Sequence, residues 1–330
     1  MPPTQQSYPL GHSILPRVPA DVASTRLEAF GPEGADHTSP GQRPGSPGLT
    51  AHRQTEGGGF IVRRPLPTHG LDILDPFLLI DEMGPAEYGP GEAVGAPDHP
   101  HRGFETVTYM LDGEFVHEDS AGHSGTIRPG DVQWMTAGAG IVHAEMPSSR
   151  IRKEGGRVHG FQIWINLPAK FKMTQPRYQG ITAERIPKAS SADGLATVRV
   201  VAGEALGASA IIDTHTPIVY QHWTLREGAD VVLPLSAEHN VLVYVFGGAI
   251  RVEDRPLSDG QLGILGAGDA VHLQGAAQSS EVLLLAGVPL GEPVARYGPF
   301  VMNTEAELRQ AFVDFRSGEM GAITRGARVD

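Results

Sequence analysis

Two short clusters of metal-binding side chains stand out in the sequence, His99-Pro-His101 and His143-Ala-Glu145. Each cluster places two donors two residues apart. On an extended strand such residues point to the same face, with Cα atoms roughly 6–7 Å apart. One of these histidines alone would more often be a structural or surface residue. Two pairs on neighbouring strands could direct four donors at one point, and this combination favours a metal site.

The types of donor narrow the choice of metal. Three imidazoles and one carboxylate suit a first-row divalent ion such as Fe, Mn, Cu, Ni or Zn, and suit Mg or Ca poorly. The chain has no cysteine, so no thiolate can take part. We therefore expect a nitrogen and oxygen site within residues 97–147.

The segments around these clusters predict short strands separated by glycine and aspartate turns, as in an all-β sandwich or barrel. In residues 158–167, alternation places Phe161, Ile163 and Ile165 on one face and Gln162, Trp164 and Asn166 on the other. The Gly- and Pro-rich residues 84–97 predict a loop. Further along, His117 and His123 lie around a predicted hairpin and are expected at its surface. The other expected strands of this half are 60–63, 77–80, 105–111, 115–118, 125–128, 132–135 and 140–145.

The second half of the chain repeats the first. Residues 107–113 match 242–248, and the Gly-Asp turn at 129–132 matches the one at 267–270. This register predicts Pro234 and Ser236 at the places of His99 and His101, and Glu281 and Leu283 at those of His143 and Glu145. The second half therefore retains the turns and lacks the ligands. Its histidines share no pair spacing and are interpreted as structural: His215, His222, His239 and His272.

The domain organisation follows from these patterns. Residues 1–57, rich in Pro, Gly, Ser and Thr, predict a disordered or surface-draped extension. Residues 58–180 form the expected metal-binding domain, and 181–330 a second domain without metal, with the junction in the polar stretch 169–187. At the end, Thr304-Glu-Ala-Glu307 is a capping box, and an apolar stripe predicts a short helix packed on a barrel: Leu308, Ala311, Phe312 and Phe315.

The bulk composition excludes several classes of function. A length of 330 residues allows two domains, and 26 basic against 38 acidic residues give a net charge of −12. With no basic stripe, direct binding of nucleic acid is not expected. No run of 18 apolar residues or signal-peptide pattern is present, and the absence of cysteine fits a reducing compartment, so we expect a cytoplasmic protein that does not span a membrane.

Two long motifs resemble those of the pirin family within the cupin superfamily. Residues 97–109, Pro-Asp-His-Pro-His-Arg-Gly-Phe-Glu-Thr-Val-Thr-Tyr, resemble the first motif, and residues 130–147 the second. Residues 76–83 and 297–300 also look like pirin sequence. The resemblance covers residues 58–320 and implies two jelly-roll cupin β-barrels in tandem, with one iron in the first barrel.

The resemblance assigns the ligand role to His99, His101, His143 and Glu145, the same four residues that spacing indicates. Other cupins more often use a glutamate a few residues after the histidine pair, which here is Glu105. That residue is either a proton acceptor beside the ligands or a member of a salt bridge at the end of a strand. Mn, Ni, Cu or Zn remain possible in place of iron.

Bacterial pirins resemble quercetin 2,3-dioxygenases, which open a flavonol with O2 and release carbon monoxide. This resemblance implies that a flavonol-like aromatic binds at the metal through a deprotonated hydroxyl, while Glu145 or Glu105 accepts the proton. Eukaryotic pirins resemble regulators that bind transcription factors under control of the metal's oxidation state, so a protein partner is the alternative. Five residues are candidates for lining a substrate pocket, each equally plausible as core: Phe104, Trp134, Met135, Gln162 and Trp164.

Overall fold

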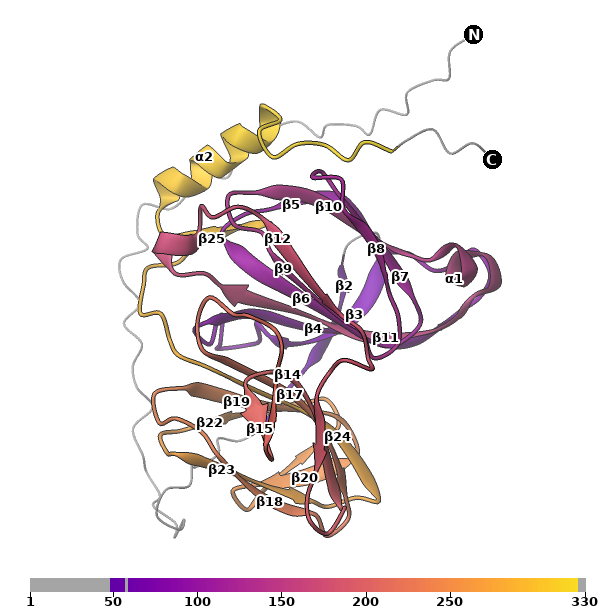
Figure 1. Ribbon diagram of the computed structural model, residues 1–330, viewed down its shortest axis with the longest axis vertical. Coiled ribbons are helices and arrows are strands. Elements are labelled where there is room, and N and C mark those ends of the chain that lie inside the picture. Colours follow the sequence, from indigo (N-terminus) through magenta and orange to yellow (C-terminus); the bar gives the residue numbers. More distant parts are fainter. Residues whose placement is uncertain (1–47, 57–58, 326–330) are drawn as a thin grey trace. The chain divides into compact units, whose positions relative to one another are not determined.

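The computed structural model describes residues 48–56 and 59–325, which form two β-barrels in tandem and two short helices (Figure 1). Each barrel combines a seven-stranded sheet with a four-stranded sheet. The predicted tandem of β-barrels with a short C-terminal helix is confirmed. The expected extension at residues 1–47 lies outside the described residues.

The first barrel contains the strands that carry the histidines. Its larger sheet has the order β12-β9-β6-β11-β4-β3-β2, and its smaller sheet has the order β5-β10-β7-β8. The strands are β2 (His52–Glu56), β3 (Phe60–Leu66), β4 (Phe77–Tyr88), β5 (Ala96–His101), β6 (Phe104–Asp112), β7 (Phe115–Asp119), β8 (Ser124–Ile127), β9 (Val132–Thr136), β10 (Ile141–Pro147), β11 (Gly156–Asn166) and β12 (Arg177–Ile181). Helix α1 (Ser149–Glu154) connects β10 to β11.

The second barrel has the same arrangement, with a larger sheet β1-β22-β19-β24-β17-β14-β13 and a smaller sheet β18-β23-β20-β21. Its strands are β1 (Leu49–Thr50), β13 (Lys188–Ser190), β14 (Ala196–Ala202), β17 (Ile218–Arg226), β18 (Asp230–Pro234), β19 (Asn240–Gly247), β20 (Ala249–Val252), β21 (Arg255–Ser258), β22 (Gln261–Leu265), β23 (Ala270–Gly275) and β24 (Ser279–Gly287). Two hairpins complete the β structure, β15 (Glu204–Ala205) with β16 (Ala208–Ser209), and β25 (Ala295–Tyr297) with β26 (Phe300–Met302).

The two larger sheets share one apolar core. Phe161 and Ile163 from β11 pack in the same buried cluster as Tyr244 and Leu283 from the second barrel. The opposite residues of β11, Gln162 and Trp164, face the interior of the first barrel, where they line a pocket. The alternation predicted for this strand is therefore observed. It separates the contact between the barrels from the candidate site.

Both ends of the described chain cross to the other barrel. β1 pairs with β22 of the second barrel, and β2 pairs with β3 of the first. Residues 49–50 and 52–56, which we expected to belong to the extension, are thus strands. After the second barrel the chain returns to the first, where α2 (Glu305–Arg316) packs its buried Leu308 and Ala311 against Val142. The predicted capping box is present, because Thr304 and Glu307 exchange hydrogen bonds.

The segment 84–97 is not the continuous loop that its composition predicted. β4 runs on to Tyr88, and β5 already begins at Ala96. Gly84 adopts a φ of +82°, and the register with β11 shifts between Val158 and Gly160. A bulge thus accommodates Gly84 and Pro85 inside a strand, as is common for these residues.

The predicted match of residues 107–113 with 242–248 agrees with the topology, because β6 and β19 hold the same place in the two larger sheets, but the register after the Gly-Asp turn was wrong by one strand. β23 lies between β18 and β20, as β10 lies between β5 and β7, so β23 is the counterpart of β10. The predicted equivalents Glu281 and Leu283 lie on β24 instead. The mistake arose because a Gly-Asp turn precedes both β9 and β23. Inside the second barrel, apolar residues of β18 and β23 occupy the place of the ligands, namely Val231, Leu233, Val271 and Leu273.

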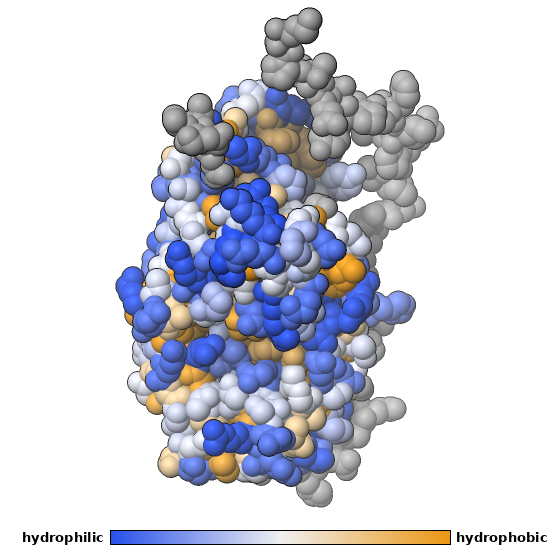
Figure 2. Space-filling model, turned by 90° about the vertical axis from the view of Figure 1, so that its right-hand side faces the viewer, coloured by the Kyte–Doolittle hydropathy of each residue, from blue (hydrophilic) through white to orange (hydrophobic). Residues whose placement is uncertain are grey.

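Figure 2 shows one face, on which polar side chains dominate and apolar ones form small separate patches. Within residues 48–56 and 59–325, neither helix is long and apolar enough to cross a membrane.

Candidate metal centre

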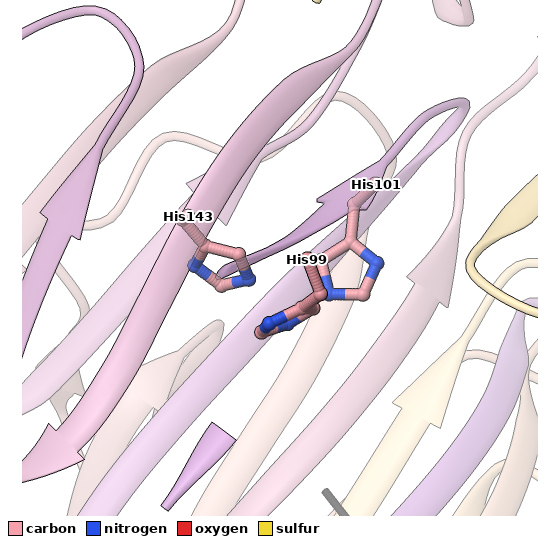
Figure 3. Close-up of side chains that lie close together, drawn as sticks. All are labelled: His99, His101 and His143. Carbon is pink, nitrogen blue, oxygen red and sulfur yellow. The ribbon is translucent and has the colours of Figure 1, made fainter. Parts of the chain in front are cut away.

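Three histidines converge inside the first barrel. They come from the antiparallel strands β5 and β10, whose register places His99 opposite His143. One ring nitrogen from each of His99, His101 and His143 lies within 4.8 Å of the others. Figure 3 shows the three rings turned toward one another. The spacing of two residues on a strand therefore does bring the imidazoles to one point.

Backbone carbonyls orient two of the rings. His99 Nδ1 lies 2.7 Å from the carbonyl oxygen of Pro97, and His101 Nδ1 lies 3.4 Å from that of Pro299. A ring that donates from Nδ1 leaves Nε2 as the free electron-pair donor, which is how a protein commonly fixes a metal-binding imidazole. Pro299 belongs to the returning C-terminal segment, so this segment helps to place His101.

Burial keeps the inner imidazoles neutral. Desolvation lowers the pKa of His101 well below its ordinary value, and the neighbouring His99 adds to the effect. The pKa of His143 is lowered in the same way, first by burial and then by the nearby histidines. Neutral imidazole is the form that binds a metal ion.

Glu145 lies two residues after His143, beyond an irregularity in the pairing of β10 with β5. Its Oε1 accepts a hydrogen bond of 2.6 Å from Thr108 Oγ1, and its Oε2 accepts one of 2.9 Å from Gln162 Nε2. The side chain lines the same pocket as His99 and His101. The carboxylate is therefore held at the site by side chains from two other strands, β6 and β11.

The histidines open onto a pocket of about 470 Å³, a size typical of small-molecule sites. Of the predicted pocket residues, Gln162 and Trp164 line it. Phe104 lies behind this wall, with its ring 5.1 Å from that of His101 and 4.5 Å from that of Trp164. The pocket thus combines a cluster of nitrogen donors with an aromatic wall.

The other predicted residues lie elsewhere. Trp134 is buried in the core between the barrels, because it shares the outward face of its sheet with Val107. Met135 belongs to a separate apolar cluster with Ile141. Both are core residues and do not line the pocket, which corrects the expectation for these two.

Glu105 points away from the pocket. It is buried, accepts a hydrogen bond of 2.6 Å from Thr136, and lies 3.1 Å from Nδ1 of His215. Neighbouring residues of a strand face opposite sides, and Thr108 of the same strand faces the pocket, so odd-numbered Glu105 faces the other way. This geometry favours the salt-bridge interpretation over a role as proton acceptor.

Sequence reasoning missed several residues at this site. His117, expected at the surface, is only 2% exposed, and its ring lies 5.8 Å from that of His143. Arg64, Asp81 and Arg296 also line the pocket. Arg64 and Asp81 come from the paired strands β3 and β4, and Arg296 joins them only when the C-terminal segment returns, so the sequence offered no local signal for this group.

The residues present fit a metal ion. Both ring nitrogens of His143 are buried and have no hydrogen-bond partner within the described part of the chain. A buried polar atom of this kind calls for a ligand. A divalent ion held by the imidazoles, with Glu145 nearby, would satisfy one nitrogen, and three nitrogens with one carboxylate suit a first-row metal.

Comparisons with known proteins agree with this site. Residues 59–165 match the Pirin family, and residues 220–321 match the Pirin C-terminal cupin domain. A pirin-like protein of Solanum lycopersicum is 44% identical over 277 residues, which are 83% of this chain and 91% of that protein. Pirin of Homo sapiens is 43% identical over 279 residues, 83% of this chain and 92% of that protein.

Among solved structures, a quercetin 2,3-dioxygenase from Acinetobacter baumannii has a TM-score of 0.80 and 39% identity. The match covers 86% of this chain and 100% of that chain. From these matches and the two barrels, this chain belongs to the pirin family.

Proposed function

We propose that this protein is an iron-dependent dioxygenase that opens flavonol-like aromatic molecules with O2. The observation that supports this proposal most is the histidine cluster at the inner end of a pocket with an aromatic wall. The similarity to a quercetin 2,3-dioxygenase structure supports the same chemistry.

In this proposal His99, His101, His143 and Glu145 hold one divalent metal. When bound, the metal supplies a Lewis acid that favours the deprotonated form of a substrate hydroxyl. Trp164 provides the apolar surface along which an aromatic ring can lie. Thr108 and Gln162 fix the Glu145 carboxylate by hydrogen bonds, so that it can accept the hydroxyl proton.

Oxygen uptake tests the proposal. The protein is purified without air, its metal content is measured, and O2 consumption is followed with quercetin. Luteolin, which lacks only the 3-hydroxyl of quercetin, is the matched control. We expect uptake with quercetin and release of carbon monoxide, and no uptake with luteolin. Iron-loaded protein that leaves quercetin unchanged in air would exclude this activity for that substrate.

A further inference from the structure

Arg296 lines the pocket from the returning C-terminal segment. It lies in the middle of β25, and Gly298 and Pro299 of the same segment also line the pocket. Its guanidinium carbon lies 5.3 Å from the centre of the Trp164 ring, and its Nη1 donates a hydrogen bond of 2.8 Å to the carbonyl oxygen of Leu78. The guanidinium is thus held in place at the pocket wall.

Two of the carboxylates near Arg296, Asp81 and Glu56, are engaged by another arginine. Arg64 Nε donates a hydrogen bond of 2.6 Å to Asp81, and Arg64 Nη2 lies 2.8 Å from Glu56. Within the described residues, no carboxylate oxygen lies within 4.0 Å of the Arg296 guanidinium. Burial lowers the pKa of Arg296 and the nearby Arg64 adds to this, while the carboxylates of Asp81, Asp72 and Glu56 act in the opposite direction. A half-buried guanidinium with unused donors is stabilised by an anionic ligand.

Trp164 connects this cation to the histidine cluster. Its ring lies 5.1 Å from the ring of His101 and also contacts Arg296. The pocket therefore has nitrogen donors on one side of the Trp164 ring system and a cation over the same ring. A molecule that fills the pocket beside Trp164 can contact both the histidines and Arg296.

We propose that, among flavonol-like aromatic molecules, this pocket prefers those that carry a carboxylate, with oxygens that bind at the histidine end and the carboxylate bound to Arg296. This inference rests on the proposed function, because it takes the histidine cluster as a metal site and the pocket as a substrate site. Arg296 is then the residue that selects charged over neutral aromatic molecules.

Binding to protein loaded with Zn²⁺, which cannot consume the probe by redox chemistry, tests the inference by calorimetry. The probes are 3,4-dihydroxybenzoate and its methyl ester, which keeps the ring and hydroxyls and removes the negative charge. A hydrogen bond between charged groups contributes more binding free energy than one between neutral groups. We therefore expect the acid to bind about tenfold tighter than the methyl ester, or more. Arg296→Gln should remove this preference by weakening the acid alone, and Arg296→Lys should restore part of it.

Arg157→Gln is the matched control, since Arg157 is half exposed and pairs with Asp112 away from this pocket. It should keep the wild-type preference. If the ester binds wild-type protein as tightly as the acid, the inference fails and the proposed function stands. Equal weakening of both probes by Arg296→Gln would also overturn it, because the arginine would then only support the wall. If neither probe binds wild-type protein, the inference fails, and oxygen uptake with quercetin decides the proposed function separately.

Discussion

Glu145 and Glu105 belong to the same barrel, but their carboxylates face different surroundings. Glu145 lies at the pocket and accepts hydrogen bonds from Thr108 and Gln162. Glu105 lies on the opposite face of β6, next to His215 of the second half. Two residues of the same type are therefore expected to respond differently to the same substitution.

Glu145→Gln keeps the size of the side chain and removes its negative charge. We expect it to weaken metal binding and to lower flavonol-dependent O2 uptake by on the order of 10²–10⁴, the usual effect of losing a general base. Glu105→Gln is the matched control and should keep both metal content and uptake. The measurements are elemental analysis and oxygen consumption. A Glu145→Gln protein with full metal and wild-type turnover would contradict this role.

At the residue scale, site residues could be predicted from the sequence where they lie close together along the chain, and could not where they lie far apart. The convergence of His99, His101 and His143 could be predicted because the spacing of two residues is a local pattern that the geometry of a strand converts into convergence. Arg296 could not be predicted, since it reaches the pocket only through the return of the C-terminal segment. Trp134 was misassigned because composition does not tell which face of a strand is inside the barrel.

At the element scale, most strands of the first barrel could be predicted from alternation and turns. The length of β4 was underestimated, because glycine and proline usually end a strand, whereas Gly84 and Pro85 here form a bulge within one. The second half was recognised as a repeat of the first. The strands after its Gly-Asp turn were matched to the wrong strands of the first half, because two turns carry the same Gly-Asp pattern. Only pairing partners distinguish them, and these are not encoded locally.

Lys172 ties the returning segment to the first barrel. Its ammonium donates hydrogen bonds to the carbonyl oxygens of Gly103 at 2.8 Å and Val301 at 3.0 Å, and to Asn166 Oδ1 at 2.6 Å. Gly103 permits this close approach, because a Cβ there would lie 2.0 Å from the Val301 carbonyl oxygen. The contact holds β26 beside the turn that follows His101.

This buried lysine predicts a pH dependence of stability. Burial lowers the pKa of Lys172 from 10.5 to about 8. Between these values the unfolded chain binds more protons, so the contribution of Lys172 to the free energy of unfolding rises with pH, by on the order of 3 kcal/mol. Denaturation by urea from about pH 7.5 to 11 should show this rise relative to Lys172→Met. Exposed Lys170→Met should behave as wild type, and a Lys172→Met protein with the wild-type rise would contradict the prediction.

At the scale of the whole molecule, the two barrels share one plan but differ in what fills them. The first encloses histidines and a pocket, whereas the second encloses a continuous apolar core. Where β5 and β10 supply ligands, β18 and β23 supply Leu233 and Leu273. Among the described residues, the three histidines of the first barrel are the only cluster that could hold a metal ion.

This division predicts one metal ion per chain. Elemental analysis of the purified protein should give a ratio near one, and His101→Ala should lose the ion, since it removes a donor from the cluster. The loss should exceed the roughly 10–100-fold weakening that follows when only a hydrogen-bond partner of a ligand is removed. His272→Ala is the matched control in the second barrel, where His272 lies 2.8 Å from Asp230, and it should keep full occupancy. Two tightly bound ions per chain, or full occupancy in His101→Ala, would show that the second barrel or other residues bind metal, and that the apolar core has not replaced the site.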